Sequence, residues 1–291
     1  MKTKYRILTL VLSLVLIAGI GYIAIKSGKP LSSGNSAVSD DFSSYLPESD
    51  NLELPSSVPS KPYSDLLSKV TDYTPVDGKV AYLTFDDGPS SVTRKILNIL
   101  AENNIKATFF VTQGTNSAIY KEILAGGHEI GIHSYSHSLK KIYASKEAFF
   151  EDFDKLRSRV IEKTNGYVPK VFRFPGGSTQ PGKAVFNEIV TELNRRGYDY
   201  YDWHVDSYDS RAVTVEKSKI VNNVLNQSKK FKTPIILMHD TSPKTTTAEA
   251  LQEIIDGLRE QGFSFEKLTQ NTKPYQMRKY TPPVLSELPS A

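Results

Sequence analysis

The chain has 291 residues, no cysteine and a formal net charge of +4. Without cysteine it can form neither disulfides nor thiolate metal sites nor thiol nucleophiles, and it cannot carry a lipid-modified N-terminal cysteine, so any metal site must use nitrogen and oxygen ligands. The small net charge and the lack of a dense basic block argue against a nucleic-acid partner.

The N-terminus predicts a membrane segment. Lys2, Lys4 and Arg6 precede an uncharged apolar run over residues 7–25, which is long enough to cross most of the hydrocarbon core of a bilayer. Basic residues on this side favour a cytoplasmic tail at 1–6 and an extracellular remainder. We therefore expect a single-pass anchor in the cell membrane. The alternative is a signal peptide that is cleaved to release a secreted protein, although the run lacks a small-x-small cleavage site at its end.

The segments on either side of the folded part are expected to be extended. Residues 26–76 are rich in Ser and Pro, and such segments bury too little apolar surface to fold alone. They predict a disordered tether, with a possible short helix at 64–71. Residues 270–291 predict a C-terminal tail, which leaves 77–269 as the folded domain.

Within this domain, buried strands alternate with amphipathic helices. The predicted strands cover 80–85, 107–111, 128–133, 171–174, 200–205, 234–238 and 263–268. The predicted helices cover 92–100, 118–124, 149–161, 185–193, 215–227 and 250–258. About seven strand–helix units in one run indicate a parallel α/β sheet, either an open doubly wound sheet or a closed barrel. The first strand is not followed by a Gly-x-Gly-x-x-Gly segment, which argues against a dinucleotide site.

Two adjacent carboxylates follow the first strand, in the sequence Asp-Asp-Gly-Pro at 86–89. Where a strand ends in a turn, Asp86 and Asp87 can both point into one cleft, and their repulsion implies a cation or a raised pKa. His133 and His137 are spaced so that, on a helical turn, both imidazoles lie on one face. Either motif alone has a commoner explanation, as a turn or a solvated helix face. Together they predict a site of two histidines and one carboxylate with open coordination positions.

Other polar residues fall at the carboxyl ends of later predicted strands. Arg173, Asp206 and His239 each end or follow an apolar run. In a β/α barrel the carboxyl ends of the strands meet at one rim, where catalytic residues lie. We therefore expect these three side chains to join the two carboxylates at one site.

Five segments resemble, in chain order, the motifs of the polysaccharide deacetylases, the NodB-homology group also called carbohydrate esterase family 4. The resemblance covers about residues 79–268, and its motifs are Thr-Phe-Asp-Asp-Gly-Pro at 84–89, His-Ser-Tyr-Ser-His at 133–137, Arg-Phe-Pro-Gly-Gly at 173–177, Trp-His-Val-Asp at 203–206 and Leu-Met-His-Asp at 237–240. It implies a distorted (β/α) barrel with fewer than eight regular units, preceded here by the membrane helix and the tether.

The resemblance implies a metal site and a catalytic base. Asp87, His133 and His137 would bind a divalent metal, usually Zn²⁺, with Co²⁺ or Mn²⁺ as alternatives. Asp86 would be the base, and Arg173 would keep it ionised and oriented.

The remaining implied roles concern the acid and the acetyl group. His239 would be the catalytic acid, and Asp206 would tune either His239 or Arg173. Leu237 would line the pocket for the acetyl methyl group, and the backbone N–H of Gly176 would donate to the oxyanion.

The expected function is hydrolysis of N-acetyl groups on cell-wall glycan, with N-acetylglucosamine of peptidoglycan as the expected substrate. Two positions depart from the family pattern, because Gly176 and Ser210 stand where the family usually carries aromatic residues. These changes bear on the groove for sugar more than on the metal. The alternatives are an O-acetyl esterase and a non-catalytic glycan-binding protein on the same scaffold.

Overall fold

A computed structural model describes residues 73–114 and 116–282. Contacts within the chain divide it into residues 1–59 and 60–291, and every described residue belongs to the second unit. The predicted anchor at 7–25 and most of the predicted tether lie outside the described residues. Within the described ranges, no helix is both long and apolar enough to cross a membrane.

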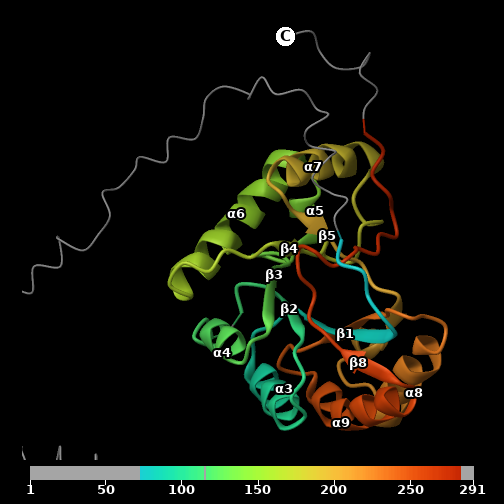
Figure 1. The fold of residues 1–291 in the computed structure, drawn as a ribbon. Coiled ribbons are helices and arrows are strands. Elements are labelled where there is room, and N and C mark those ends of the chain that lie inside the picture. The colour runs from blue at the N-terminus through green and yellow to red at the C-terminus, as the bar shows by residue number, and fades with distance from the viewer. Residues whose placement is uncertain (1–72, 115, 283–291) are drawn as a thin grey trace, which may run out of the picture. The chain divides into compact units, whose positions relative to one another are not determined.

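The centre of the described domain is a parallel sheet that forms an open half-barrel (Figure 1). Its strand order is β5-β4-β3-β2-β1-β7-β6, and β8 pairs with the first residues of β1. The described strands are β1 (Lys79–Asp86), β2 (Thr108–Val111), β3 (Glu129–Ile132), β4 (Val171–Phe172), β5 (Asp199–Tyr200), β6 (Val205–Asp206), β7 (Ile235–His239) and β8 (Phe263–Phe265). Among the described strands no pairing joins β5 to β6, so the sheet stays open on one side. The fold is a parallel α/β half-barrel, which is consistent with the predicted distorted (β/α) barrel.

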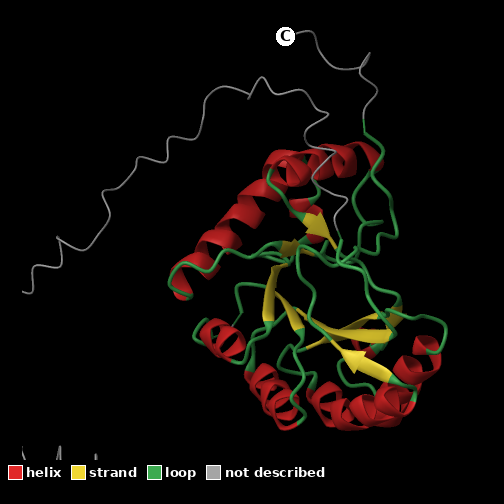
Figure 2. Cartoon of the chain, viewed as in Figure 1, coloured by secondary structure: helices red, strands yellow, loops and turns green. Residues whose placement is uncertain are grey.

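Helices cover the outer face of the sheet (Figure 2). They are α3 (Ser91–Glu102), α4 (Ile119–Ala125), α5 (Leu139–Ile142), α6 (Lys146–Lys163), α7 (Lys183–Arg195), α8 (Lys217–Ser228) and α9 (Thr245–Glu260), with a short 3-10 turn, η3 (Asp209–Arg211). Local sequence fixes where several of them begin. The Ser90 hydroxyl accepts from the N–H of Val92 at 3.0 Å, and the Thr93 hydroxyl accepts from the N–H of Ser90 at 2.8 Å. This reciprocal cap satisfies N–H groups that the first turn of α3 would leave unpaired.

The sheet separates two apolar clusters, because successive strand side chains point to opposite faces. On β1, Leu83 and Phe85 pack toward the helices, whereas Val80 and Tyr82 belong to a smaller cluster inside the half-barrel. Trp203 packs against this inner cluster. The inner cluster fills the half-barrel beneath the carboxyl ends of the strands.

The predicted strand at 200–205 is wrong as a single element, because the chain crosses the open side of the half-barrel there. The N–H of Tyr201 donates to Phe172 on β4, whereas the N–H of His204 donates to Ile235 on β7. One continuous strand cannot pair with both edges of the opening. The segment is therefore split into β5 and β6, and eight described strands replace the seven predicted ones.

The predicted tail also differs, since its described part at 270–282 packs on the domain. The Tyr275 carbonyl accepts from the N–H of Asp202 at 2.9 Å. The Tyr200 hydroxyl donates to the Arg278 carbonyl at 2.6 Å, and the Arg278 N–H donates to the Ser178 hydroxyl at 2.9 Å. Residues 270–282 therefore brace the connection that crosses the open side, and the folded domain extends beyond 269.

Truncation of Phe172 tests the packing outside the sheet. Its ring is 0% exposed and lies 4.8 Å from the ring of Phe174 and 5.5 Å from that of Phe149, between centroids. We expect Phe172→Ala to lower the free energy of unfolding by about 3–5 kcal/mol, measured by denaturant titration. Val213→Ala is the control, because Val213 is 72% exposed, and it should change stability by less than about 0.5 kcal/mol. Equal effects of the two variants would contradict this packing.

Candidate metal and catalytic site

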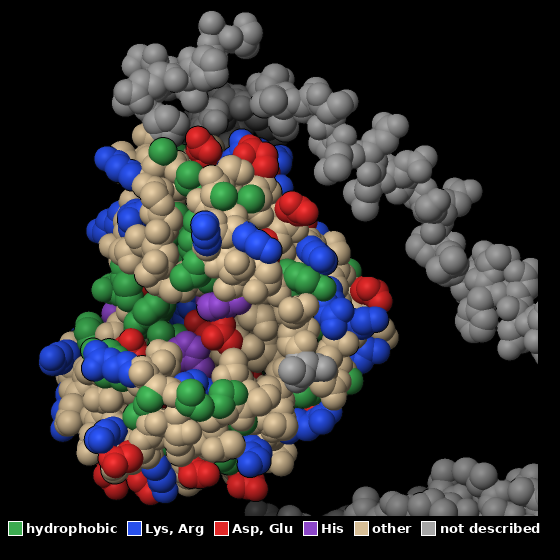
Figure 3. All heavy atoms as spheres, turned by 180° about the vertical axis from the view of Figure 1, so that it is seen from behind, with side chains coloured by type: hydrophobic (Ala, Val, Ile, Leu, Met, Phe, Trp, Pro, Cys, Tyr) green, Lys and Arg blue, Asp and Glu red, His purple; other side chains and the backbone are tan. Residues whose placement is uncertain are grey.

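A cavity of about 380 Å³ lies at the carboxyl ends of the strands. It is lined by Asp86, Asp87, His133, His137, Gly176, Trp203, Asp206, Ser210, Leu237, His239 and Lys244. Figure 3 shows histidine and acidic side chains gathered in a hollow on this face of the molecule. Eight of the nine predicted site residues line this cavity, and the ninth, Arg173, is fully buried and bonded to Asp86.

Asp87, His133 and His137 come together as predicted. The Oδ1 atom of Asp87 lies 3.4 Å from Nε2 of His133 and 3.2 Å from Nε2 of His137. One ligand atom from each residue lies within 4.8 Å of the others. Oδ1 of Asp87 is buried and has no hydrogen-bond partner among the described residues. Such an atom is costly to bury without a partner, so these residues fit a divalent cation that takes nitrogen and oxygen ligands.

The ring of His133 is oriented by a backbone carbonyl. Its Nδ1 lies 2.8 Å from the carbonyl oxygen of Arg173, which can only accept, so Nδ1 carries the proton and Nε2 offers its lone pair toward Asp87. Burial, opposed by the charge of Asp87, lowers the pKa of His133 to about 3. The imidazole is therefore neutral at physiological pH, as a metal ligand must be.

His137 lies on a loop, so the helical turn expected for the two histidines is wrong. Residues 133–138 form no helix, and His137 has a left-handed backbone with φ 51°. The two imidazole rings nevertheless lie 5.3 Å apart, between centroids. The loop therefore brings the two rings together without a helical backbone.

Asp152 on α6 binds this loop through three hydrogen bonds, and no sequence motif predicted its role. Its carboxylate accepts from the Ser134 hydroxyl at 2.7 Å, from the Tyr135 N–H at 2.6 Å and from the Ser136 N–H at 2.9 Å. The Ser134 hydroxyl in turn accepts from the N–H of His137 at 2.9 Å. The His137 side chain is 41% exposed, so its position depends more on this backbone clamp than on packing.

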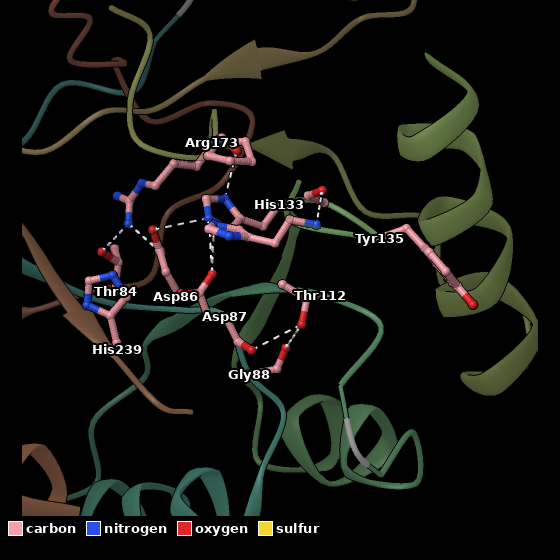
Figure 4. Close-up of polar contacts among 12 residues, drawn as sticks. Thr84, Asp86, Asp87, Gly88, Thr112, His133, Tyr135, Arg173 and His239 are labelled. Atoms are coloured by element: carbon pink, nitrogen blue, oxygen red, sulfur yellow. Dashed lines mark hydrogen bonds and ion pairs between the residues drawn. The ribbon is translucent and has the colours of Figure 1, made fainter. Parts of the chain in front are cut away.

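Asp86 lies against Arg173, with His133 and His239 on opposite sides of it (Figure 4). Nη1 of Arg173 donates to Oδ1 of Asp86 at 2.8 Å and to the Thr84 hydroxyl at 2.7 Å. Burial raises the pKa of Asp86, although the charges of Arg173 and His239 oppose this shift. The Arg173–Asp86 contact expected from the resemblance is thus present, and it leaves Oδ2 of Asp86 toward the cavity side, 3.8 Å from Nε2 of His133.

The carboxylate that binds His239 is Asp209, which the sequence analysis did not single out. Oδ1 of Asp209 lies 2.7 Å from Nδ1 of His239, and Oδ2 accepts from the His239 N–H and from the Thr247 hydroxyl, both at 2.8 Å. Burial alone would lower the pKa of His239, but the hydrogen bond and charge of Asp209, with the charges of Asp86 and Asp87, raise it to about 9. His239 is therefore a charged donor at neutral pH.

Asp206, which was predicted to tune His239 or Arg173, lines the cavity but bonds to neither. Its Oδ1 accepts from the N–H of Tyr208 at 2.7 Å, and the described structure gives its carboxylate no hydrogen bond to His239 or Arg173. Asp209 takes the place at His239 because Tyr208 has a left-handed backbone, φ 57°, which turns the chain between the two carboxylates. The only sequence feature that points to this partner is the presence of Asp209 three positions after Asp206.

The sequence is similar to those of known polysaccharide deacetylases. A family model described as polysaccharide deacetylase matches residues 73–201. A peptidoglycan-N-acetylglucosamine deacetylase of Bacillus cereus is 37% identical over 198 residues, which are 65% of this chain and 68% of that protein. The chain belongs to the polysaccharide deacetylase family. This is a family of hydrolases that act on carbon–nitrogen bonds other than peptide bonds.

Two further relatives support the family assignment. A putative polysaccharide deacetylase of Bacillus subtilis is 28% identical over 92% of this chain and 91% of its own length. The crystal structure of the catalytic domain of peptidoglycan N-acetylglucosamine deacetylase from Eubacterium rectale superposes with a TM-score of 0.69, at 31% identity, over 73% of this chain and 98% of that one.

The two positions that depart from the family pattern, Gly176 and Ser210, both line the cavity. Trp203 lines the cavity and covers Gly177, where an added Cβ would lie 3.1 Å from the indole ring. Ser210 is exposed at the cavity wall. Leu237 lines the cavity as predicted, and the Gly176 N–H makes no hydrogen bond within the described ranges, so it is available to a ligand.

Replacing Asp209 should return the pKa of His239 toward its ordinary value of 6.5. We expect Asp209→Asn in the metal-free protein to lower the pKa from about 9, as measured by NMR titration of the imidazole. A pKa raised in the folded state means that protonated His239 stabilises the fold below pH about 6.5 and that this stabilisation is lost as pH rises through about 9. An Asp209→Asn titration identical to that of the unmodified protein would contradict this pairing, whereas Asp206→Asn should shift the value less.

Replacing Asp152 should weaken metal binding without removing a ligand. Asn cannot accept all three bonds, because its amide nitrogen would face an N–H or hydroxyl donor. We expect Asp152→Asn to raise the zinc dissociation constant about 10- to 100-fold, measured by chelator competition. Asp154→Asn is the control on the same helix, since Asp154 pairs with Arg196 at the surface. Wild-type zinc affinity in both variants would show that the clamp does not position His137.

Proposed function

We propose that this protein is a metal-dependent deacetylase that removes N-acetyl groups from peptidoglycan N-acetylglucosamine and releases acetate. The observation that carries the proposal is the convergence of three kinds of group in one cavity. These are the Asp–His–His set, a buried carboxylate bonded to an arginine, and a histidine charged at neutral pH. The substrate is inferred from the relatives, because the similar proteins of Bacillus cereus and Eubacterium rectale are both described as peptidoglycan N-acetylglucosamine deacetylases.

We propose Zn²⁺ as the metal at Asp87, His133 and His137, with Co²⁺ and Mn²⁺ as alternatives. Two imidazoles and one carboxylate leave coordination positions open, as is usual for catalytic zinc. When bound, such a cation would polarise the acetyl carbonyl and make a water more acidic.

The side chains around this position divide the proton transfers between them. Asp86 would accept a proton from the attacking water, and its raised pKa brings it closer to neutral pH, where a base is more effective. Arg173 would hold the carboxylate in place throughout. His239 would donate a proton to the departing nitrogen, which as a free amide anion would be too poor a leaving group.

Two groups would hold the acetyl moiety. The Gly176 N–H would donate to the oxygen that becomes negative during attack, and Leu237 would contact the methyl group. Since both proton-transfer residues are in place, we favour an enzyme over a glycan-binding protein. Hydrolysis of O-acetyl groups is the alternative that uses the same residues.

We further propose that the domain acts at the outer face of the cell membrane. The apolar run at 7–25, preceded by basic residues, would anchor the chain, and the Ser/Pro-rich segment after it would let the domain reach wall glycan. Cleavage of the run as a signal peptide would instead give a secreted enzyme.

Acetate release tests the proposed function and the base together. The zinc-loaded protein should release acetate from N-acetylated wall glycan, and Asp86→Asn should retain zinc while losing about 10²- to 10⁴-fold in kcat. Asp77→Asn, an exposed position before β1, should keep wild-type turnover. No acetate from N-acetylated glycan would overturn the proposal, and release from O-acetylated glycan alone would support the esterase. Full activity in Asp86→Asn would remove Asp86 as the base.

A further inference from the structure

The turn between β6 and α8 separates the catalytic cavity from a second, larger one. Asp206 and Ser210 face the catalytic cavity. Tyr208 and Arg211, on the same turn, line a cavity of about 650 Å³. The other residues of this second cavity, all from the segment between η3 and the middle of α8, are Ala212, Thr214, Val215, Glu216, Lys219, Asn222 and Asn223.

Hydrogen bonds from two sides hold this turn. Nζ of Lys244, which is 8% exposed, donates to the carbonyls of Asp209 at 2.7 Å and Ala212 at 2.6 Å. On the other side, Nδ2 of Asn223 donates to the Ser207 carbonyl at 3.0 Å. The wall between the two cavities therefore exists before any substrate binds.

Arg211 offers a planar cation to the second cavity, and its charge also lowers the pKa of Asp206 against the effect of burial. Its guanidinium carbon lies 3.6 Å from the centroid of the Tyr208 ring, and it forms no ion pair with any residue in 73–114 or 116–282. Lys219, the other cation of the cavity, is paired with Glu216 at 3.0 Å. A guanidinium stacked on an aromatic ring has already lost much of its rotational freedom and presents a fork of N–H donors that matches a carboxylate.

We propose that the cavity at Tyr208 and Arg211 binds a carboxylate of the substrate strand while a neighbouring N-acetyl group occupies the catalytic cavity. The amide of Asn222 and the hydroxyl of Thr214 also line this cavity and offer further hydrogen-bond donors to such a polar ligand. The inference rests on the proposed deacetylase function and specifies its substrate. Peptidoglycan carries carboxylates on its peptides, and on its lactyl groups once the peptides are removed, whereas N-acetylglucosamine oligomers carry none. The site therefore selects an acidic strand over a neutral one.

The test compares acetate release by the full zinc-loaded chain from peptide-bearing glycan strands and from neutral N-acetylglucosamine oligomers. We expect Arg211→Gln to lower the ratio of kcat/KM for the acidic over the neutral substrate about tenfold, as loss of one charge-assisted pair would. Arg211→Lys, which keeps the charge but not the fork, should lower it less. Lys229→Gln removes an exposed cation of the same region outside both cavities and should leave the ratio unchanged.

A third substrate identifies the carboxylate. With strands stripped of peptide by an amidase, persistence of the Arg211→Gln effect shows that the site also accepts the freed lactyl carboxylate, and its loss shows that the site requires the peptide carboxylate. Binding of a soluble disaccharide-peptide, measured by calorimetry without turnover, should weaken about tenfold in Arg211→Gln. This readout separates the inference from the proposed function, which acetate release from the neutral oligomer tests alone. An unchanged ratio together with unchanged binding, or equal losses in Arg211→Gln and Lys229→Gln, would overturn the inference.

Discussion

Arg173 reaches Asp86 across the interior of the half-barrel, and its guanidinium is 0% exposed. Desolvating such a cation costs several kcal/mol, so it is tolerated only when its partners are complete. Here the partners come from segments that are distant in the chain. They are Asp86 on β1 and the Tyr201 carbonyl in the connection that crosses the open side, and the carbonyl of Arg173 itself accepts from His133. Through its side chain and its backbone carbonyl, this one buried residue fixes the proposed base, a proposed metal ligand and the crossing segment relative to each other.

His133 and His239, both in the cavity, show that the hydrogen-bond partner of an imidazole determines whether it is neutral or charged. Nδ1 of His133 faces a neutral carbonyl, and burial keeps its pKa at about 3. Nδ1 of His239 faces the carboxylate of Asp209, which outweighs the effect of burial and raises the pKa to about 9. The proposed mechanism uses both states at once, because a neutral imidazole can bind metal and a charged imidazole can donate a proton.

The sequence predicts those parts of the site that local pattern determines. β1 and β7 are apolar runs that end in Asp86 and His239, and their pairing brings these two residues side by side in register. The parts that failed depend on contacts distant in the chain. Whether His133 and His137 meet on a helix or on a loop depends on Asp152, which is on another element. Two further features depend on contacts that form only in the folded chain. One is the pairing of His239 with Asp209 instead of Asp206. The other is the split of the predicted strand at 200–205, which pairs with β4 at one end and β7 at the other.

We propose that two imidazoles and one carboxylate bind a single cation beside the Arg173–Asp86 pair. X-ray absorption spectroscopy of the zinc-loaded full chain measures this most directly. We expect two imidazole nitrogens at about 2.0–2.1 Å and a carboxylate oxygen at about 2.0–2.2 Å. After His133→Ala, any zinc that remains should have one nitrogen fewer. A zinc shell of oxygen atoms alone, or a shell that His133→Ala leaves unchanged, would contradict it.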